Sequence, residues 1–366
     1  MPIAEVRTHW LDAPLHTPFV TALRSATSVR TLVVELVDTD GQSGFGEAPQ
    51  VWQVTGASLA GAQQCVEEML APRLLGRDPD DLVTNCRLVQ RAVAANETAK
   101  AAVDVALHDL VARRLGVPLV RLLGGTSLHV ATDVTLSAGD PRTLASAAAD
   151  RVAEGFTVLK LKVGTDAAGD AARVRAVRDQ VGPAVALRLD ANQGWTPRAA
   201  VAVISAIEEQ GLDVELVEQP VPAWDLAGLA WVSDRVRTPV MADESVYSVR
   251  DLVELIHRRA ADMVNVKLAK CGGLGAARTL LALAEEHGMG TIVGSMMEGP
   301  VGVAAAASLA AAHGTTAACD LDAAWWLASP PVLGGMHYAG AQVQLADAPG
   351  LGISAIISSS SKGLDT

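Results

Sequence analysis

Five charged residues each close a short apolar run of the chain: Lys162, Asp190, Glu218, Asp243 and Lys267. The runs are rich in Val and Leu, and successive members of the set are 24 to 28 residues apart. Such an interval accommodates a strand, a helix and two short loops, which is the repeat of a parallel βα barrel. Because the strand ends of a barrel converge on one mouth, the pattern predicts two lysines and three carboxylates in one pocket.

The three carboxylates of this set, Asp190, Glu218 and Asp243, would come from adjacent strand ends. Hard oxygen ligands of this kind suit Mg²⁺ or Mn²⁺, with water or substrate completing the coordination. Taken singly, an acidic residue at a strand end is usually a loop cap or a solvated group. Three that converge without a cation would repel one another in a partly buried mouth. The set therefore predicts a metal site.

Lys160 and Lys162 lie two positions apart on one predicted strand, so their side chains leave the same face. Strands of a parallel barrel have no solvated face, which disfavours the alternative of two exposed lysines. A neighbouring ammonium and a divalent cation would both lower the pKa of Lys162 toward the range of a general base. The same argument applies to Lys267 on the opposite wall.

Asp320 and Asp322 form a second acidic pair at the end of the last predicted strand, too late in the chain to join the metal set. Two carboxylates at a pocket wall can accept the three N–H donors of an ammonium group. A helix N-cap is the alternative interpretation of the pair. Arg24 stands in a polar loop, residues 17–27, where a guanidinium can clamp a carboxylate, although a lone loop arginine is usually surface.

The whole chain sets outer limits on function. Its 366 residues, 50% of them hydrophobic, allow one barrel of about 200 to 250 residues plus a smaller domain. A formal net charge of −12 argues against nucleic-acid binding, and no apolar run is long enough to span a bilayer. The four cysteines have no zinc-site spacing, and the first ten residues carry no secretory signal, so we expect a cytoplasmic protein.

The pattern divides the chain into three parts: an α+β domain at residues 1–125, a (β/α) barrel at 126–325 and a returning C-terminal segment at 326–366. In the first, a hairpin turn is predicted at residues 38–41 and a long helix at 99–115. Eight barrel strands are predicted, at residues 130–136, 158–163, 184–190, 214–218, 239–243, 263–268, 290–294 and 316–320. Residues 358–366 predict a disordered tail.

The charged residues sit in local motifs. These are Lys160-Leu161-Lys162, Asp190-Ala191-Asn192, Glu218-Gln219-Pro220, Asp243-Glu244-Ser245 and Lys267-Leu268-Ala269-Lys270, with residues 44–49 (GFGEAP), 122–125 (LLGG) and 349–352 (PGLG). Over nearly its whole length the chain thereby resembles the enolase superfamily, muconate-lactonizing-enzyme subgroup. The resemblance implies an α/β fold: a modified (β/α)7β-type TIM barrel with an α+β capping domain built from the N-terminal region and the C-terminal tail. It also implies a lysine base and one Mg²⁺ per site.

Within this subgroup, the motif Asp320-Leu321-Asp322 resembles the one by which dipeptide epimerases hold the α-ammonium of their substrate. The resemblance then assigns Lys162 and Lys267 as the two bases, with Lys160 tuning the first or stabilising the enolate. It further implies substrate contacts at Arg24, Thr135 and Met297, and supporting roles behind the metal ligands for Asn192 and Glu244. We expect a homo-oligomeric dipeptide epimerase for L-Ala-D/L-Glu, a substrate of cell-wall peptide metabolism.

Other activities share this scaffold. They are N-succinylamino acid racemase, o-succinylbenzoate synthase and muconate-type cycloisomerase, and the fold alone does not separate them. The acidic pair argues against them, because their substrates offer it no ammonium. A catalytically silent dipeptide-binding protein is a further alternative, which a base on each face disfavours. Trp52 and Gly299 depart from the family pattern, so the preferred side chain stays open.

Overall fold

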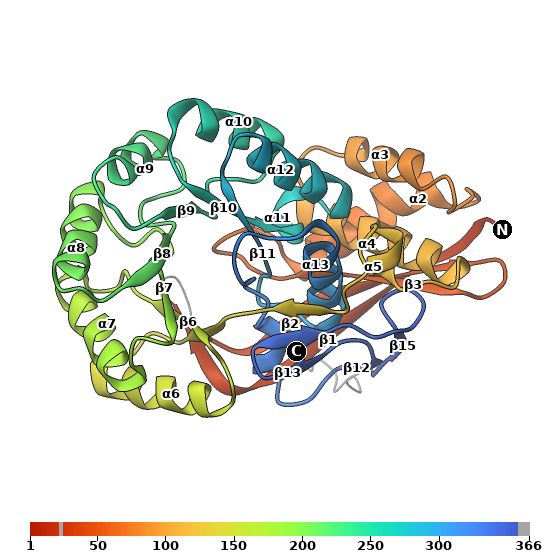
Figure 1. Cartoon of the computed structure of the whole chain (residues 1–366). Coiled ribbons are helices and arrows are strands. Elements are labelled where there is room, and N and C mark those ends of the chain that lie inside the picture. The colour runs from red at the N-terminus through yellow and green to blue at the C-terminus, as the bar shows by residue number, and fades with distance from the viewer. Residues whose placement is uncertain (22–24, 358–366) are drawn as a thin grey trace, which may run out of the picture.

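The chain is described by a computed structural model over residues 1–21 and 25–357. Arg24 and the predicted tail at residues 358–366 lie outside the described residues. An antiparallel sheet and its helices pack against a curled parallel sheet that is wrapped by helices on its outer side (Figure 1). None of the described helices combines the length and the hydropathy that crossing a bilayer requires.

The antiparallel sheet begins the chain and has the order β1 (Ile3–Val20), β2 (Ser25–Asp38), β3 (Ser43–Pro49). The predicted turn between the last two is confirmed, since Gly41 N donates to Asp38 O at 3.0 Å. β1 and β2 form a long hairpin whose far end reaches the barrel. There Ala138 N donates to Val20 O at 3.0 Å, which places the hairpin end beside the mouth.

Helices follow the sheet: α1 (Leu59–Gln64), π-helix η1 (Cys65–Leu70), α2 (Ala71–Leu74), α3 (Leu82–Ala92), α4 (Glu97–Arg114) and α5 (Leu119–Leu122). The predicted long helix is confirmed as α4, which is buried on all sides from Thr98 to Ala112. A helix with no solvated face must satisfy its polar side chains internally. Asp104 accepts a hydrogen bond from Leu274 N of the barrel at 2.7 Å, and Thr98 donates to Ala269 O at 3.1 Å. The helix therefore connects the N-terminal sheet to the barrel.

The close approach of α4 to β3 depends on two glycines. A Cβ at Gly46 would lie 1.8 Å from the backbone oxygen of Ala102, and one at Gly44 would lie 2.3 Å from that of Ala106. Both contacts are to backbone, which cannot rotate away as a side chain can. The GFGEAP motif thus lets a strand and a helix lie against each other without side chains between them.

Seven parallel strands form the curled sheet of the described residues, in the order β11-β10-β9-β8-β7-β6-β5. They are β5 (Val134–Leu136), β6 (Val158–Lys162), β7 (Ala186–Asp190), β8 (Val214–Glu218), β9 (Val240–Ala242), β10 (Met263–Lys267) and β11 (Gly290–Gly294). Their outer side carries α6 (Pro141–Ala153), α7 (Ala167–Val181), α8 (Pro197–Glu209), α9 (Leu226–Ser233), α10 (Val249–Arg258), α11 (Leu268–Cys271), α12 (Leu274–Glu286) and α13 (Pro300–His313). Strand, helix and loop alternate as the spacing predicted.

Two predicted strands are wrong in detail. Residues 130–136 split into β4 (His129–Ala131) and β5, because the first part pairs with β14 (Gln342–Gln344) instead of the barrel. Residues 316–320 form only isolated bridges at Cys319 and Asp320. These two residues still link the sheet edges: Asp133 N donates to Cys319 O at 2.9 Å, and Ser295 N donates to Asp320 O at 2.9 Å.

The C-terminal segment contains the 3₁₀-helix η2 (Ala323–Trp326) and the strands β12 (Val332–Gly334), β13 (His337–Ala339), β14 and β15 (Ile353–Ile356). β14 pairs with β4 next to the barrel, whereas Arg113 of α4 donates to Ile353 O at 2.6 Å. The segment therefore contacts both parts of the molecule. The domain boundaries at residues 125 and 325 stay predictions.

The glycine contact between β3 and α4 gives a first prediction. Gly46→Ala should destabilise the fold by about 3 kcal/mol or more, because overpacking against backbone forces the strand off the helix. Gly275→Ala is the control: it lies inside α12, its Cβ would meet nothing closer than 3.9 Å, and it should gain up to about 1 kcal/mol. Urea unfolding measures both, and equal stabilities for the two variants would contradict the close contact.

Candidate active site

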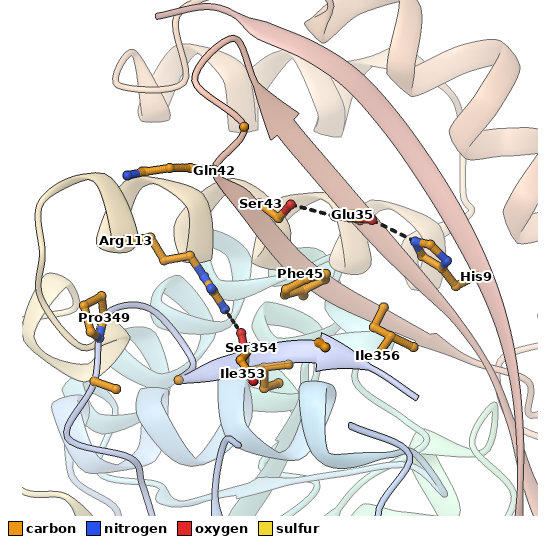
Figure 2. Close-up of a pocket in the computed structure, with 14 residues that line it drawn as sticks. His9, Glu35, Gln42, Ser43, Phe45, Arg113, Pro349, Ile353, Ser354 and Ile356 are labelled. Carbon is orange, nitrogen blue, oxygen red and sulfur yellow. Dashed lines mark hydrogen bonds and ion pairs between the residues drawn. The ribbon is translucent and has the colours of Figure 1, made fainter. Parts of the chain in front are cut away.

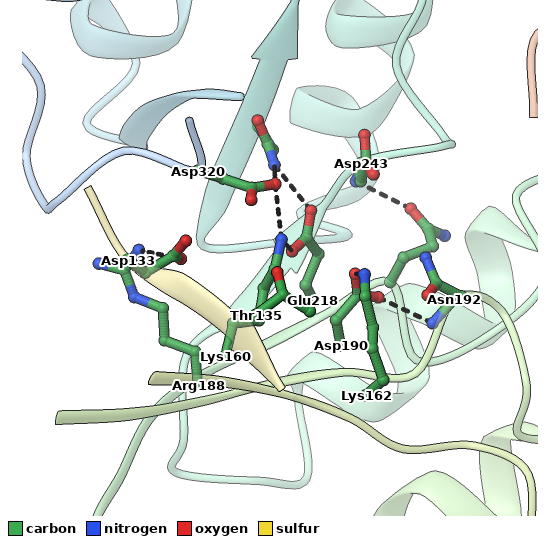
Figure 3. Close-up of polar contacts among 12 residues, drawn as sticks. Asp133, Thr135, Lys160, Lys162, Arg188, Asp190, Asn192, Glu218, Asp243 and Asp320 are labelled. Carbon is green, nitrogen blue, oxygen red and sulfur yellow. Dashed lines mark hydrogen bonds and ion pairs between the residues drawn. The ribbon is translucent and has the colours of Figure 1, made fainter. Parts of the chain in front are cut away.

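The inner face of the barrel is lined by alternate residues of its strands, because successive side chains of a strand point to opposite faces. Inward pairs two residues apart are Lys160 with Lys162, Arg188 with Asp190, and Asn265 with Lys267, and all of these are buried. The register sets Lys162 beside Asp190 and Asp190 beside Glu218. The strand ends thus form one charged layer at the mouth (Figure 3).

The lysines of this layer pair with its carboxylates. Lys162 Nζ lies 2.5 Å from Asp190 Oδ2, and Lys267 Nζ lies 2.8 Å from Asp243 Oδ2. Lys160 Nζ lies 2.6 Å from Asp320 Oδ2. The structure therefore brings together the five residues at the predicted strand ends. Asp320 pairs with Lys160 in the same layer, and its exclusion from the three-carboxylate metal set stays a prediction.

Asp322 lies at the start of η2, but its side chain does not cap that helix. Its Oδ2 accepts hydrogen bonds from Thr135 N at 2.8 Å and from Trp326 Nε1 at 3.0 Å. The alternative interpretation of the acidic pair as a helix N-cap is therefore wrong. Asp133, Asp320 and Asp322 each place a carboxylate oxygen within 4.8 Å of the others, which makes this wall a receptor for positive charge.

Several buried oxygens of the layer have no hydrogen-bond partner among the described residues. They are Glu218 Oε2, Glu244 Oε2 and Asn192 Oδ1, and all three are acceptors. Burial raises the pKa of Glu244 to about 8, with the charges of Asp243 and Asp190 adding to the effect. Burial likewise raises the pKa of Glu218 to about 7. Unsatisfied oxygens with excess negative charge fit a hard divalent cation.

The same excess of buried carboxylates sets the pKa values of Lys267 and Lys160. Burial alone would lower the pKa of Lys267, but the carboxylates of Asp243 and Glu218 outweigh it and hold that pKa well above its ordinary value. The pKa of Lys160 is held above its ordinary value in the same way by Asp320 and Glu218. For Lys267 this is opposite to the lowered pKa expected from the sequence. That expectation assumed a cation beside the lysine, and the chain alone supplies uncompensated carboxylates instead.

A cavity of about 70 Å³ opens on this layer. Ten of the predicted site residues line it: Thr135, Lys160, Lys162, Asn192, Asp243, Glu244, Lys267, Met297, Asp320 and Asp322. Asp190 and Glu218 lie behind its wall, next to Lys162 and Lys160. The remaining wall is largely apolar and includes Phe19, Val51, Val54 and Met296. A small charged cavity with apolar sides is suited to a compact zwitterionic ligand.

A larger cavity of about 850 Å³ lies elsewhere, between the N-terminal sheet and β15 (Figure 2). Its charged groups already have partners within the chain. Glu35 accepts from His9 at 2.9 Å and from Ser43 at 2.6 Å, and Arg113 donates to the backbone of β15. Size alone would favour this cavity, but its imidazole and its carboxylate, His9 and Glu35, already bond to each other, and its lining offers no lysine and no set of converging carboxylates. We therefore place the active site at the barrel mouth.

Four buried polar residues near the mouth were missed by the sequence reasoning: Arg188, Asp133, Asn265 and Lys270. Arg188 forms ion pairs with Asp133 at 3.1 Å and with Glu215 at 2.6 Å. Asn265 Nδ2 donates to Glu218 Oε1 at 2.7 Å. A signal for Arg188 and Asn265 exists in the sequence, since each precedes a predicted site residue by two positions and so shares its face.

Lys270 is the fourth missed residue. Its Nζ lies 2.5 Å from Asp243 Oδ1, so that this one carboxylate contacts Lys267 and Lys270 together. These two ammonium groups overcome the effect of burial and lower the pKa of Asp243. Lys270 lies on the short helix α11, directly after the strand of Lys267, so no strand periodicity could have indicated that it turns back toward the mouth.

The unusual glycine at position 299 has a physical reason. Glu47 of β3 accepts hydrogen bonds from Gly299 N at 2.6 Å and from Gly302 N at 2.8 Å, at the start of α13. A Cβ at residue 299 would lie only 2.7 Å from Glu47 Oε1. The glycine thus lets a carboxylate of the N-terminal sheet reach the positive end of a barrel helix. Trp52, the other departure, is 57% exposed.

Comparisons with known proteins agree with this geometry. The chain matches the mandelate racemase / muconate lactonizing enzyme N-terminal domain over residues 3–124 and the enolase C-terminal domain-like family over residues 143–356. An L-Ala-D/L-Glu epimerase of Clostridium acetobutylicum is 41% identical over 356 residues, covering 97% of this chain and 99% of that protein.

Solved structures show the same likeness. The substrate-liganded complex of the L-Ala-D/L-Glu epimerase from Bacillus subtilis has a TM-score of 0.95 at 41% identity, covering 97% of this chain and 99% of that one. A dipeptide epimerase from Enterococcus faecalis, complexed with Mg and L-Leu-L-Tyr, has a TM-score of 0.93 at 38% identity, covering 97% and 100%.

Barrel, capping sheet and lysine–carboxylate mouth together define an enolase-type scaffold, and the fold class expected from the sequence is confirmed. The chain belongs to the mandelate racemase / muconate lactonizing enzyme family of the enolase superfamily.

Glu298, next to Gly299, gives a prediction about pH. Burial, and then the charge of Glu47, raise the pKa of this carboxyl to about 8. A raised pKa means that the folded state binds the proton more tightly than the unfolded chain, so stability is lost as pH rises from about 4.5 to 8. Glu298→Gln is neutral throughout, so the melting temperature of the metal-free variant should fall less than that of the wild type between pH 5 and 9.

The control for this measurement is Glu286→Gln, which removes an exposed carboxylate at the end of α12. Its melting temperature should follow the wild-type pH curve. Parallel curves for the wild type and Glu298→Gln would show that Glu298 does not carry a proton in the folded protein.

Proposed function

We propose that this chain is a dipeptide epimerase, an isomerase that inverts the α-carbon of the C-terminal residue of a dipeptide, with L-Ala-D/L-Glu as the first candidate substrate. The observation that carries the proposal is the pair Lys162 and Lys267. These lysines come from β6 and β10, which are separated by three strands of the curled sheet, and both line the same cavity. A proton removed on one side of a carbon can thus be replaced from the other.

The carboxylates of Asp190, Glu218 and Asp243 would hold one Mg²⁺, or Mn²⁺ in its place, with Asn192 and Glu244 behind them. The partnerless oxygens in this layer support that assignment. A divalent cation held there would neutralise these carboxylates, would weaken their hold on the protons of Lys160 and Lys267, and would supply Lewis-acid stabilisation for the negative charge of the substrate carboxylate.

The lysines divide the chemistry between them. One, as the neutral amine, takes the α-proton onto its Nζ. The C–H electron pair becomes a second bond between the α-carbon and the carboxylate carbon, and a C–O π pair moves onto a carboxylate oxygen. The other, as the ammonium, gives a proton to the opposite face of the same carbon. Their protonation states are exchanged at the end of each turnover, and they exchange roles with the direction of reaction. Lys160, buried between Asp320 and Glu218, supplies a further positive charge beside the substrate carboxylate.

The acidic wall would bind the other end of the dipeptide. Asp320 and Asp322 face the cavity with Thr135, and a free α-ammonium matches their charge. N-succinylamino acids, the o-succinylbenzoate synthase substrate and muconate carry no ammonium, so this wall disfavours those activities. Similar proteins named as epimerases act on L-Ala-D/L-Glu, which supports Glu as the epimerised residue. Met297 would contact its side chain, and Arg24 its carboxylate.

The setting of this activity is part of the proposal. The cysteines of the described chain are free, which suits the reducing cytoplasm, and a D-Glu-containing dipeptide suits the metabolism of cell-wall peptides. We further propose a homo-oligomer, as expected from the sequence.

A substrate panel in D₂O tests the proposed function. L-Ala-L-Glu, a hydrophobic and a cationic L-Ala-L-X dipeptide, and an N-succinylamino acid are each incubated with enzyme and Mg²⁺, and α-proton exchange is followed by NMR. We expect exchange at the C-terminal residue of L-Ala-L-Glu, and its loss when EDTA removes the metal. Exchange with the N-succinylamino acid alone would replace the proposal with a racemase.

The two-lysine mechanism makes a stereochemical prediction. Lys162→Ala and Lys267→Ala should each slow epimerisation by about 10²- to 10⁴-fold, the usual contribution of a general acid–base group. Each variant should retain α-proton exchange with only one epimer of the substrate. The epimer that still exchanges should differ between the two variants. Circular dichroism and dipeptide binding by calorimetry serve as controls. If both variants lost α-proton exchange with the same epimer, bases on opposite faces would be ruled out.

A further inference from the structure

In the described part of the chain, hydrogen bonds hold the carboxylate of Asp322 through one of its two oxygens. Both of its hydrogen bonds, from Thr135 N at 2.8 Å and from Trp326 Nε1 at 3.0 Å, end on Oδ2. Within residues 1–21 and 25–357, no hydrogen bond to Oδ1 is found. Two donors on one oxygen fix the rotation of the carboxylate about its Cβ–Cγ bond. The other oxygen is then available to a ligand in the cavity that Asp322 lines.

The indole of Trp326 is itself held in place. The ring is buried and packs against the imidazole of His16, with centroids 5.4 Å apart and planes 12° apart. Phe19 meets it edge-on at 5.2 Å. His16 and Phe19 both belong to β1, so the hairpin that reaches the mouth fixes the direction in which the indole N–H points.

Trp326 also borders the side of the cavity that carries a lysine. Phe19, which packs against the indole, lines the cavity, and Lys162 Nζ lies 5.9 Å from the centre of its ring. One indole therefore contacts the wall near the proposed base and hydrogen-bonds the carboxylate proposed for the ammonium. Its neighbour Trp325 shares part of this packing, edge-on to His16 at 4.6 Å and to Trp326 at 5.3 Å, and also lies against Phe156 and beneath the guanidinium of Arg151 at 4.6 Å.

We propose that Trp326 is a positioning residue for substrate recognition: its indole N–H holds Asp322 so that Oδ1 faces the α-ammonium of the dipeptide. The inference rests on the proposed function and goes beyond it, because it identifies what orients the acidic wall. Asp320 needs no such help, since Lys160 lies 2.6 Å from it. Asp322 has no lysine within ion-pair distance among the described residues, so its geometry depends on the two N–H donors.

Trp326→Phe tests this role, because phenylalanine keeps an aromatic ring against His16 and Phe19 but has no N–H. We expect KM for the dipeptide that the wild type accepts to rise about tenfold, with kcat changed less than about twofold, as for loss of a hydrogen bond to a charged group. The inhibition constant of the N-acetylated form of that dipeptide, which has no ammonium, should stay unchanged.

Trp325→Phe is the matched control, since it makes the same change in a ring that packs beside Trp326, whereas the indole hydrogen bond to the Asp322 carboxylate comes from Trp326. Its KM should equal that of the wild type. A double-mutant cycle with Asp322→Asn then separates positioning from packing: the effect of Trp326→Phe on KM should largely disappear when the carboxylate is absent. An undiminished effect in that background would overturn the proposal, and so would equal changes in both tryptophan variants.

Two further outcomes are distinguishable. A wild type that exchanges no α-proton of any dipeptide would overturn the proposed function, and this inference with it. A wild type that epimerises dipeptides, with an unchanged KM in Trp326→Phe, would overturn the inference alone. Should Trp326→Phe fail to fold, 3-benzothienylalanine at position 326 replaces the N–H with sulfur in a ring of the same shape, and the same KM comparison decides the question.

Discussion

Charge compensation inside the barrel is the constraint on which the rest of this structure depends. Lysines and carboxylates fill a layer from which water is largely excluded, and an unpaired charge in such a place is expensive. The chain meets this by pairing each lysine with a carboxylate, as in Lys162 with Asp190 and Lys267 with Asp243. The pairing is incomplete, because carboxylates outnumber the available cations. That imbalance is what makes the mouth a site for added positive charge.

The N-terminal sheet and its helices serve the same layer indirectly. Buried carboxylates on these elements accept hydrogen bonds from the starts of barrel helices: Asp104 from α12 and Glu47 from α13. Each of these bonds crosses from one part of the molecule to the other and satisfies amides that the helix itself cannot. The N-terminal sheet and α4 are thereby tied to α12, which follows the strand of Lys267, and to α13, which precedes Asp320 and Asp322.

Much of the site could be predicted because strand periodicity is a strong signal. Charged residues at the ends of apolar runs, spaced as βα units, had to meet at one mouth, and Asp190, Glu218 and Asp243 do lie in one layer. Arg188 and Asn265 lie two positions before a strand end, so the same periodicity covers them, but the predicted set contained only the last residue of each of these strands. Asp133, two positions before Thr135, is covered by the periodicity as well, but Lys270 could not be found this way, since it lies on the short helix α11 after the strand.

The spacing could not predict where the barrel closes. Residues 316–320 have the composition of a strand, yet the chain there only bridges two neighbours at single residues. Whether a short apolar run forms a ladder depends on partners far away in sequence, such as β14, which takes up β4. The pKa of Lys267 likewise depends on groups far apart in the sequence: without a cation, Asp243, Glu218 and Asp320 together hold it well above its ordinary value.

The closure of the barrel by single residues has an evolutionary consequence. Asp320 and Asp322, the proposed ligands of the substrate ammonium, belong to the least regular part of the wall, whereas the lysines and the proposed metal ligands belong to continuous strands or to their ends. A substitution or small insertion around residue 321 breaks few ladder hydrogen bonds. Substrate choice can therefore drift in a lineage of such proteins while proton transfer is inherited unchanged.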